Sequence, residues 1–148
     1  MEREEFLNRV RQLNVWKRGG ERAPHKPLLV LYALGRFSRG LFTPVPFAEV
    51  DRDLKCLLQD FGPTRKSYHP EYPFWRLQND GLWVVEGARN LKTRRGHKDP
   101  KKSELLDKNV QGALSSGVQS LLRGKPNLIT VAAQEILEHI SHRPYTMT

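Results

Sequence analysis

The chain has 148 residues, of which 38% are hydrophobic and 28% charged, proportions typical of a globular domain rather than a disordered chain. Lysine and arginine number 25 against 16 acidic residues, and this net charge of +9 at pH 7 favours a polyanionic partner such as nucleic acid. The single cysteine, Cys56, excludes an internal disulfide. Because no apolar run is long enough for a membrane span, we expect no membrane partner and a cytoplasmic location.

Three helices are expected in the first part of the chain, because apolar residues recur there at helical spacing. The second is almost entirely apolar, so it is expected to be the central buried helix, with Pro27 in its first turn. Gly62-Pro63 should end the third helix. The expected ranges are residues 2–14, residues 27–37, and residue 46 or 47 up to Gly62.

A loop and a β-hairpin are expected next. Residues 64–73 contain two prolines among basic and imidazole side chains, which indicates an irregular loop. Phe74–Leu77 and Leu82–Val85 are β-prone, and Asn79-Asp80-Gly81 lies between them. Glycine and asparagine accept positive φ angles, so this tripeptide is typical of a tight hairpin turn.

The last third should be mostly helical after a basic loop over residues 87–102. Asp99-Pro100 suits the cap and first turn of a helix that continues to about Leu106. Further helices are expected near Val110–Leu122 and over about Thr130–Ile140, with a turn at residues 124–127 between them. The chain is therefore predicted to be one α+β domain over residues 1–148, mostly helical, with a small antiparallel β-hairpin or sheet.

Residue spacing argues against two kinds of catalytic site. The five histidines are scattered without ligand spacing, so we expect no metal and no other cofactor. Asp51, Asp53 and Lys55 form a D-x-K triplet of the kind found in metal-dependent nucleases, which normally place it on a strand. On the expected helix, residues two apart point about 200° apart and would not converge. We therefore expect no catalytic residues and no enzymatic activity.

Three segments together carry the components of a DNA-binding surface. Prolines, histidines and cations lie close together in Arg22–Pro27 and in Tyr68–Arg76, and seven lysines and arginines lie within Arg89–Lys102. Basic side chains neutralise phosphates, and the N-terminus of a helix beginning at Pro27 favours an anion. Turn formation and core packing explain either proline-containing segment equally well when it is taken alone. The combination favours nucleic acid, contacted through its phosphates and an apolar feature.

The same segments resemble the sulfur-binding domain of phosphorothioate-dependent type IV restriction endonucleases of the McrA-like, HNH type. The matching motifs are Arg22-Ala23-Pro24-His25-Lys26-Pro27-Leu28-Leu29 with Tyr32-Ala33-Leu34-Gly35, and His69-Pro70-x-Tyr72-Pro73-Phe74-Trp75-Arg76-Leu77 with Asn79-Asp80-Gly81-Leu82-Trp83. This resemblance implies recognition of double-stranded DNA in which sulfur replaces a non-bridging phosphate oxygen. It also implies that cleavage belongs to a separate HNH nuclease domain, whose motif is absent from these 148 residues.

The resemblance further implies a shallow apolar cavity for the sulfur, lined by Tyr72 and Pro73 with His25, Lys26 and Arg76 beside it. Sulfur is more polarizable and less hydrated than oxygen, whereas an ordinary phosphate oxygen placed there would lose hydration at a cost of about 1–3 kcal/mol. Phosphates and bases are expected to be contacted by further residues, namely Arg22, Arg65, Lys66, His69, Arg89, Arg94, Arg95, His97, Lys98, Lys101 and Lys102.

Three questions stay open at this stage. A DNA-binding domain that uses the same basic surface but ignores sulfur is the alternative function. The segment Leu91–Ser103 is more basic than in some relatives, so the preferred sequence around the modified link is expected to differ. Neither the flanking bases nor the oligomeric state follows from these residues.

Overall fold

The structure is a computed structural model that describes residues 1–15, 17–18, 21–22, 25–61, 68–89, 91 and 99–141, with side chains described for residues 1–13, 25–61, 68–89, 91 and 99–140. Its helices are α1 (Arg3–Val15), α2 (His25–Ser38), α3 (Phe47–Phe61), α4 (Glu71–Arg76), the 3-10 helix η1 (Leu77–Asp80), α5 (Lys102–Asp107), α6 (Ser116–Leu122) and α7 (Pro126–Ser141). Its strands are β1 (Lys17–Arg18), β2 (Glu21–Arg22), β3 (Val45–Pro46), β4 (Trp83–Glu86) and β5 (Gln111–Leu114).

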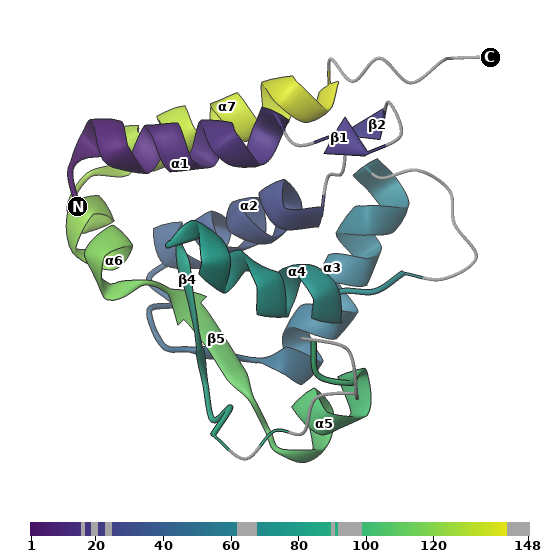
Figure 1. The fold of residues 1–148 in the computed structure, drawn as a ribbon. Coiled ribbons are helices and arrows are strands. Elements are labelled where there is room, and N and C mark those ends of the chain that lie inside the picture. Colours follow the sequence, from purple (N-terminus) through teal and green to yellow (C-terminus); the bar gives the residue numbers. More distant parts are fainter. Residues whose placement is uncertain are drawn as a thin grey trace.

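Helix α2 is the centre of the fold, as its apolar sequence predicts. It contacts α1, α3, α4 and α7, and α1 and α7 lie side by side across it (Figure 1). Leu28, Leu29 and Val30 are completely buried in its first half. Burial of such side chains stabilises the fold by about 1.5–3 kcal/mol each, so packing around α2 is the main support for the elements that carry the candidate site.

The boundaries of most predicted helices are confirmed to within a few residues. Helix α3 begins at Phe47 as expected, whereas α2 begins two residues early, at His25. Helix α7 begins at Pro126, about four residues early, because proline suits a first helical turn whose N–H groups have no intrahelical acceptor. Helix α5 begins late, at Lys102, and its N-cap residue is Lys101 rather than Asp99.

The predicted hairpin between Phe74–Leu77 and Leu82–Val85 is wrong. Phe74 belongs to α4, and η1 follows directly. Pro73 is the third residue of α4, where the missing N–H costs nothing. Gly81 does adopt a positive φ of 74°, but it ends η1 instead of closing a hairpin. The expected loop over residues 64–73 is correspondingly replaced by helix from Glu71 onward, and its residues 64–67 lie outside the described part.

The three-stranded sheet has the order β3-β5-β4, and both pairings are antiparallel. Strand β5 lies within the range Val110–Leu122 that was predicted to be entirely helical, and only its second part forms α6. The aromatic rings of Phe47, Phe74 and Trp83 pack edge to face and join α3, α4 and the sheet into one core. The predicted fold class, mostly helical α+β with a small antiparallel sheet, is confirmed.

Candidate nucleic-acid interface

Three exposed side chains form a row along α4. Tyr72 and Arg76 are four residues apart on one face of α4, and His69, two residues before the helix begins, continues the row. The ring centroids of His69 and Tyr72 are 5.0 Å apart with an interplanar angle of 22°, and Arg76 Cζ lies 4.8 Å from the Tyr72 centroid. Tyr72 remains 37% exposed. The row thus presents an aromatic surface between two groups that can contact an anion.

A buried carboxylate lies beneath this row. Glu71 is 7% exposed, and its Oε2 lies 3.2 Å from His69 Nδ1. Its Oε1 is buried without a hydrogen-bond partner among the described residues. A carboxylate next to one ring nitrogen favours a proton on that nitrogen, which directs Nε2 away from Glu71. Glu71 therefore orients the imidazole of His69.

Arg76 forms an ion pair with Asp99, the residue that was expected to cap α5. Arg76 Nε and Nη2 donate hydrogen bonds to Asp99, the shorter one 2.6 Å long from Nη2 to Oδ2. These hydrogen bonds raise the pKa of Arg76 above its ordinary value, against the opposing effect of burial. The contact fixes the end of the basic segment, just before α5, against α4.

The second motif is joined to the first by another ion pair. Lys26, the second residue of α2, places its Nζ 2.7 Å from Oδ2 of Asp80 at the end of η1. Helix α2 also packs against α4. His25 is the first residue of α2 and is half-buried. The structure therefore brings the α2 N-terminus and the α4–η1 segment into contact.

The two residues predicted to line the cavity differ in exposure. Tyr72 is exposed, whereas Pro73 is buried in the first turn of α4. Phe74 is completely buried, and Trp75 packs partly against the core. Their roles toward sulfur stay predictions, and Tyr72 is the member of the pair whose ring is exposed to a partner.

Apart from His69, the predicted phosphate contacts fall into four groups. Arg89 and Lys101 are exposed. Lys102 is partly buried and lies 2.9 Å from Asp51 Oδ1, so it links α5 to α3. The backbone of Arg22 is in β2 but its side chain is not described, and a further group lies outside the described residues, namely Arg65, Lys66, Arg94, Arg95, His97 and Lys98.

The three residues of the D-x-K triplet are held by different interactions. All three residues lie in α3, as predicted, and their partners differ. Asp51 is paired with Lys55 and Lys102, whereas Asp53 accepts hydrogen bonds from Tyr32 and Arg52. In the described part of the chain, no group of three or more His, Cys, Asp or Glu side chains is arranged to hold a metal ion.

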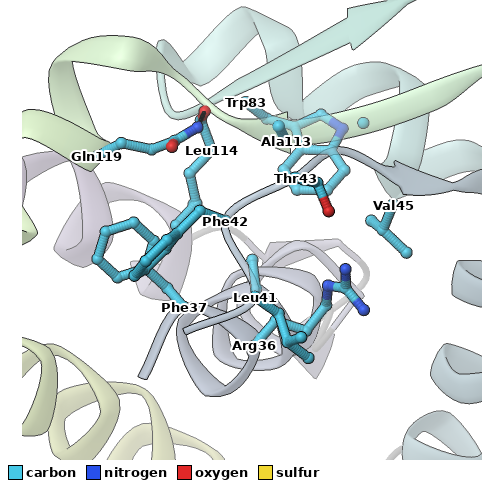
Figure 2. A pocket seen from close by; sticks show the side chains of 12 residues that line it. Arg36, Phe37, Leu41, Phe42, Thr43, Val45, Trp83, Ala113, Leu114 and Gln119 are labelled. Atoms are coloured by element: carbon cyan, nitrogen blue, oxygen red, sulfur yellow. Dashed lines mark hydrogen bonds between the residues drawn. The ribbon is translucent and has the colours of Figure 1, made fainter. Parts of the chain in front are cut away.

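A pocket lies elsewhere, between α2, the residues after it, the sheet and α6 (Figure 2). Its lining includes Phe37, Phe42, Trp83 and Leu114, and none of the predicted site residues. This apolar hollow is therefore separate from the His69–Tyr72–Arg76 row.

Among the described helices, none is long and apolar enough to span a membrane.

The net charge of +9 and the exposed row of aromatic and basic side chains fit a DNA-binding module. Residues 3–143 match the sequence model of the ScoMcrA-like DNA sulfur-binding domain. The chain belongs to this family. No curated protein matches the chain.

Several solved structures share the fold. The sulfur-binding domain of ScoMcrA complexed with phosphorothioated DNA has 26% identity and a TM-score of 0.82, over 93% of this chain and 87% of that one. The corresponding complex of SprMcrA has 25% identity and a TM-score of 0.72, over 94% and 85%. The type IV phosphorothioation-dependent restriction endonuclease ScoMcrA has 24% identity and a TM-score of 0.76 over 90% of this chain, but this chain covers only 25% of it.

Sequence reasoning missed three carboxylates of the site. Asp80 was interpreted as a turn residue, Asp99 as a helix cap, and Glu71 had no assigned role. The partners of Asp80 and Asp99 are 54 and 23 residues away in the sequence, so local patterns carry no signal for these pairs. For Glu71, the available signal was its position, two residues after His69 in a proline-rich segment.

Proposed function

We propose that this domain binds double-stranded DNA that carries a phosphorothioate link, with the sulfur against Tyr72 and the remaining negative charge close to Lys26 and Arg76. The observation that carries the proposal is the exposed His69–Tyr72–Arg76 row, in a fold shared with two sulfur-binding domains that are complexed with phosphorothioated DNA. Pro73 and His25 complete the proposed cavity.

The chemistry of the row suits sulfur better than oxygen. The Tyr72 ring offers apolar contact area, and contact with polarizable sulfur gains dispersion energy. An unmodified phosphate oxygen at the same place would lose water without gaining a hydrogen bond, at a cost of about 1–3 kcal/mol. That cost corresponds to about a 5- to 150-fold difference in affinity. Exposed cations such as Arg89 and Lys101 would add salt-sensitive phosphate contacts.

The paired-duplex experiment tests this proposal. Two duplexes of one sequence, one with a single stereodefined phosphorothioate and one unmodified, are titrated with the 148-residue chain at a fixed salt concentration. We expect the modified duplex to bind about 5- to 150-fold more tightly. Because the preferred sequence is open, several flanking sequences and both stereoisomers are compared. Equal affinity for every modified and unmodified pair would identify a DNA-binding domain that ignores sulfur.

The biological setting is part of the same proposal. A domain that reads the modification would direct restriction to modified DNA when it acts with an HNH nuclease domain, and the cytoplasm is where that DNA lies. The single domain over residues 1–148 supplies recognition in this scheme, and cleavage comes from elsewhere. Addition of Mg²⁺ to the chain with modified DNA should therefore produce no cleavage.

A further inference from the structure

The two cations expected beside the sulfur are both neutralised within the protein. Lys26 Nζ lies 2.7 Å from Asp80 Oδ2, and Arg76 Nη2 lies 2.6 Å from Asp99 Oδ2. The two acidic side chains are only 25% and 20% exposed, which is less than their basic partners at 32% and 47%. Part of each basic side chain is therefore accessible to a ligand, while its charge is balanced by the less exposed aspartate.

A neutralised cation attracts an ordinary phosphate weakly. Phosphate carries the same sign of charge as the aspartate, so its approach adds a like-charge repulsion that offsets much of the attraction to the cation. Counterion release is also reduced, because a cation already paired with a carboxylate neutralises less of the DNA charge. Contact through Lys26 and Arg76 alone would thus give little affinity.

The same ion pairs hold the cations in place. Lysine and arginine have long, mobile side chains, and fixing them beforehand lowers the entropic cost of binding. Arg76 is held by two of its nitrogens and also lies over the Tyr72 ring. A phosphorothioate link gains additional affinity from apolar contact with Tyr72. It would therefore benefit from cations that are already held in position, even though their charge is neutralised.

We propose that Asp80 and Asp99 determine the specificity of the site, by masking Lys26 and Arg76 against unmodified phosphates while holding both cations in position for the phosphorothioate. The carboxylates thereby suppress binding to the large excess of ordinary DNA. This inference rests on the proposed function, which assigns the sulfur to the same site.

Two aspartate variants and a matched control test the inference. Asp80→Asn frees Lys26, and Asp99→Asn independently frees Arg76 on a different segment of the chain. The control is Glu135→Gln, which frees Arg11 from a 2.8 Å ion pair between α1 and α7 and makes the same change in net charge. Thermal unfolding checks that each variant is folded, and either folded aspartate variant suffices for the test.

Affinities for the modified and unmodified duplexes are measured from about 50 to about 200 mM salt. Each aspartate variant should bind the unmodified duplex more tightly at low salt, and the slope of log K against log salt should steepen by about 0.9 for each freed cation. That slope corresponds to about a 3.5-fold additional change over the fourfold salt range. The modified duplex should gain less or lose affinity, so the preference for sulfur falls. Glu135→Gln should leave slope and preference unchanged.

Two results would overturn the inference. One is an unchanged slope and an unchanged preference for sulfur in the folded aspartate variants. The other is an equal effect of Glu135→Gln, which would mean that total charge, not position, is responsible. Failure of the proposed function is a separate result, since it appears as equal binding of both duplexes by the unaltered chain, whereas the salt slope on unmodified DNA reports masking in either case.

Discussion

The imidazole of His69 stacks on the phenol ring of Tyr72, with centroids 5.0 Å apart and ring planes 22° from parallel. His69 lies two residues before α4 and Tyr72 is the second residue of that helix, with the buried carboxylate of Glu71 between them in the sequence. The stack keeps the Tyr72 ring in a defined orientation at the surface. A fixed ring costs less entropy on binding than a mobile one, so this pair of residues prepares the apolar part of the proposed site.

Replacement of Tyr72 should abolish the preference for sulfur. In Tyr72→Gln the apolar surface is lost while the cations remain, so we expect affinity for the modified duplex to fall by about 5- to 150-fold, to the level of the unmodified one. Weak, salt-sensitive binding should persist. Tyr72→Phe keeps the ring and should retain the preference. Tight binding of the modified duplex by Tyr72→Gln would show that the sulfur contacts other residues.

Removal of His69 should destabilise the fold as well as the site. In His69→Ala the buried carboxylate of Glu71 loses its described hydrogen-bond partner, and we expect a loss of about 1–3 kcal/mol in the free energy of unfolding, measured by urea denaturation. The double variant His69→Ala with Glu71→Gln removes the buried charge and should recover part of this loss. Additive effects of the two substitutions would argue against the interaction.

Gly112 should not tolerate a side chain. A Cβ atom at this position in β5 would collide with the Trp83 indole and would lie 2.9 Å from Phe74 Cε2. Gly112→Ala should therefore lower the free energy of unfolding by about 1–3 kcal/mol. Gly35 in α2 is the matched control, because a Cβ there meets nothing within 4 Å and Gly35→Ala should stabilise the helix by up to about 1 kcal/mol. Equal effects of the two substitutions would contradict this packing.

The hydrogen bond between Tyr32 and Asp53 should make stability depend on pH at both extremes. Burial, and then the hydrogen bond it donates to Asp53, raise the pKa of Tyr32 from 10.0 to about 12. Since the folded pKa is the higher one, this contribution is complete below pH 10 and is lost as the pH rises from 10 to about 12. The loss should be absent in Tyr32→Phe, which should also be about 1–2 kcal/mol less stable at pH 7.

The pKa of Asp53 is shifted in the opposite direction to that of Tyr32. Burial raises its pKa, but hydrogen bonds from Arg52 and Tyr32 outweigh that effect and the net pKa is below 3.8. Its contribution is therefore present above pH 3.8 and is lost as the pH falls through the folded pKa. Denaturation curves at a series of pH values for the unaltered chain and for Tyr32→Phe would measure both effects. Identical alkaline profiles in the two proteins would contradict the assignment to Tyr32.

Periodicity was sufficient for the long helices, since α1, α2, α3 and α7 each bury one continuous face or most of their surface. The short elements depended on distant partners. The β-prone residues around Phe74 form helix because Phe74 packs between Phe47 and Trp83, and β4 pairs with β5 rather than with the segment Phe74–Leu77. Local propensity cannot report such pairings, because residues far apart in the sequence decide them.

The sequence alone determined the basic charge, the central apolar helix and the two motifs that identify the family, because these follow from composition, short-range spacing and directly readable residues. Only the tertiary structure decided that His69, Tyr72 and Arg76 form one exposed row, that Pro73 is buried, and that Lys26 and Arg76 are paired with Asp80 and Asp99. The physical reason is that exposure and ion pairing depend on which segments meet in space. Folding sets the distances between charges, and those distances determine which cations remain available to DNA.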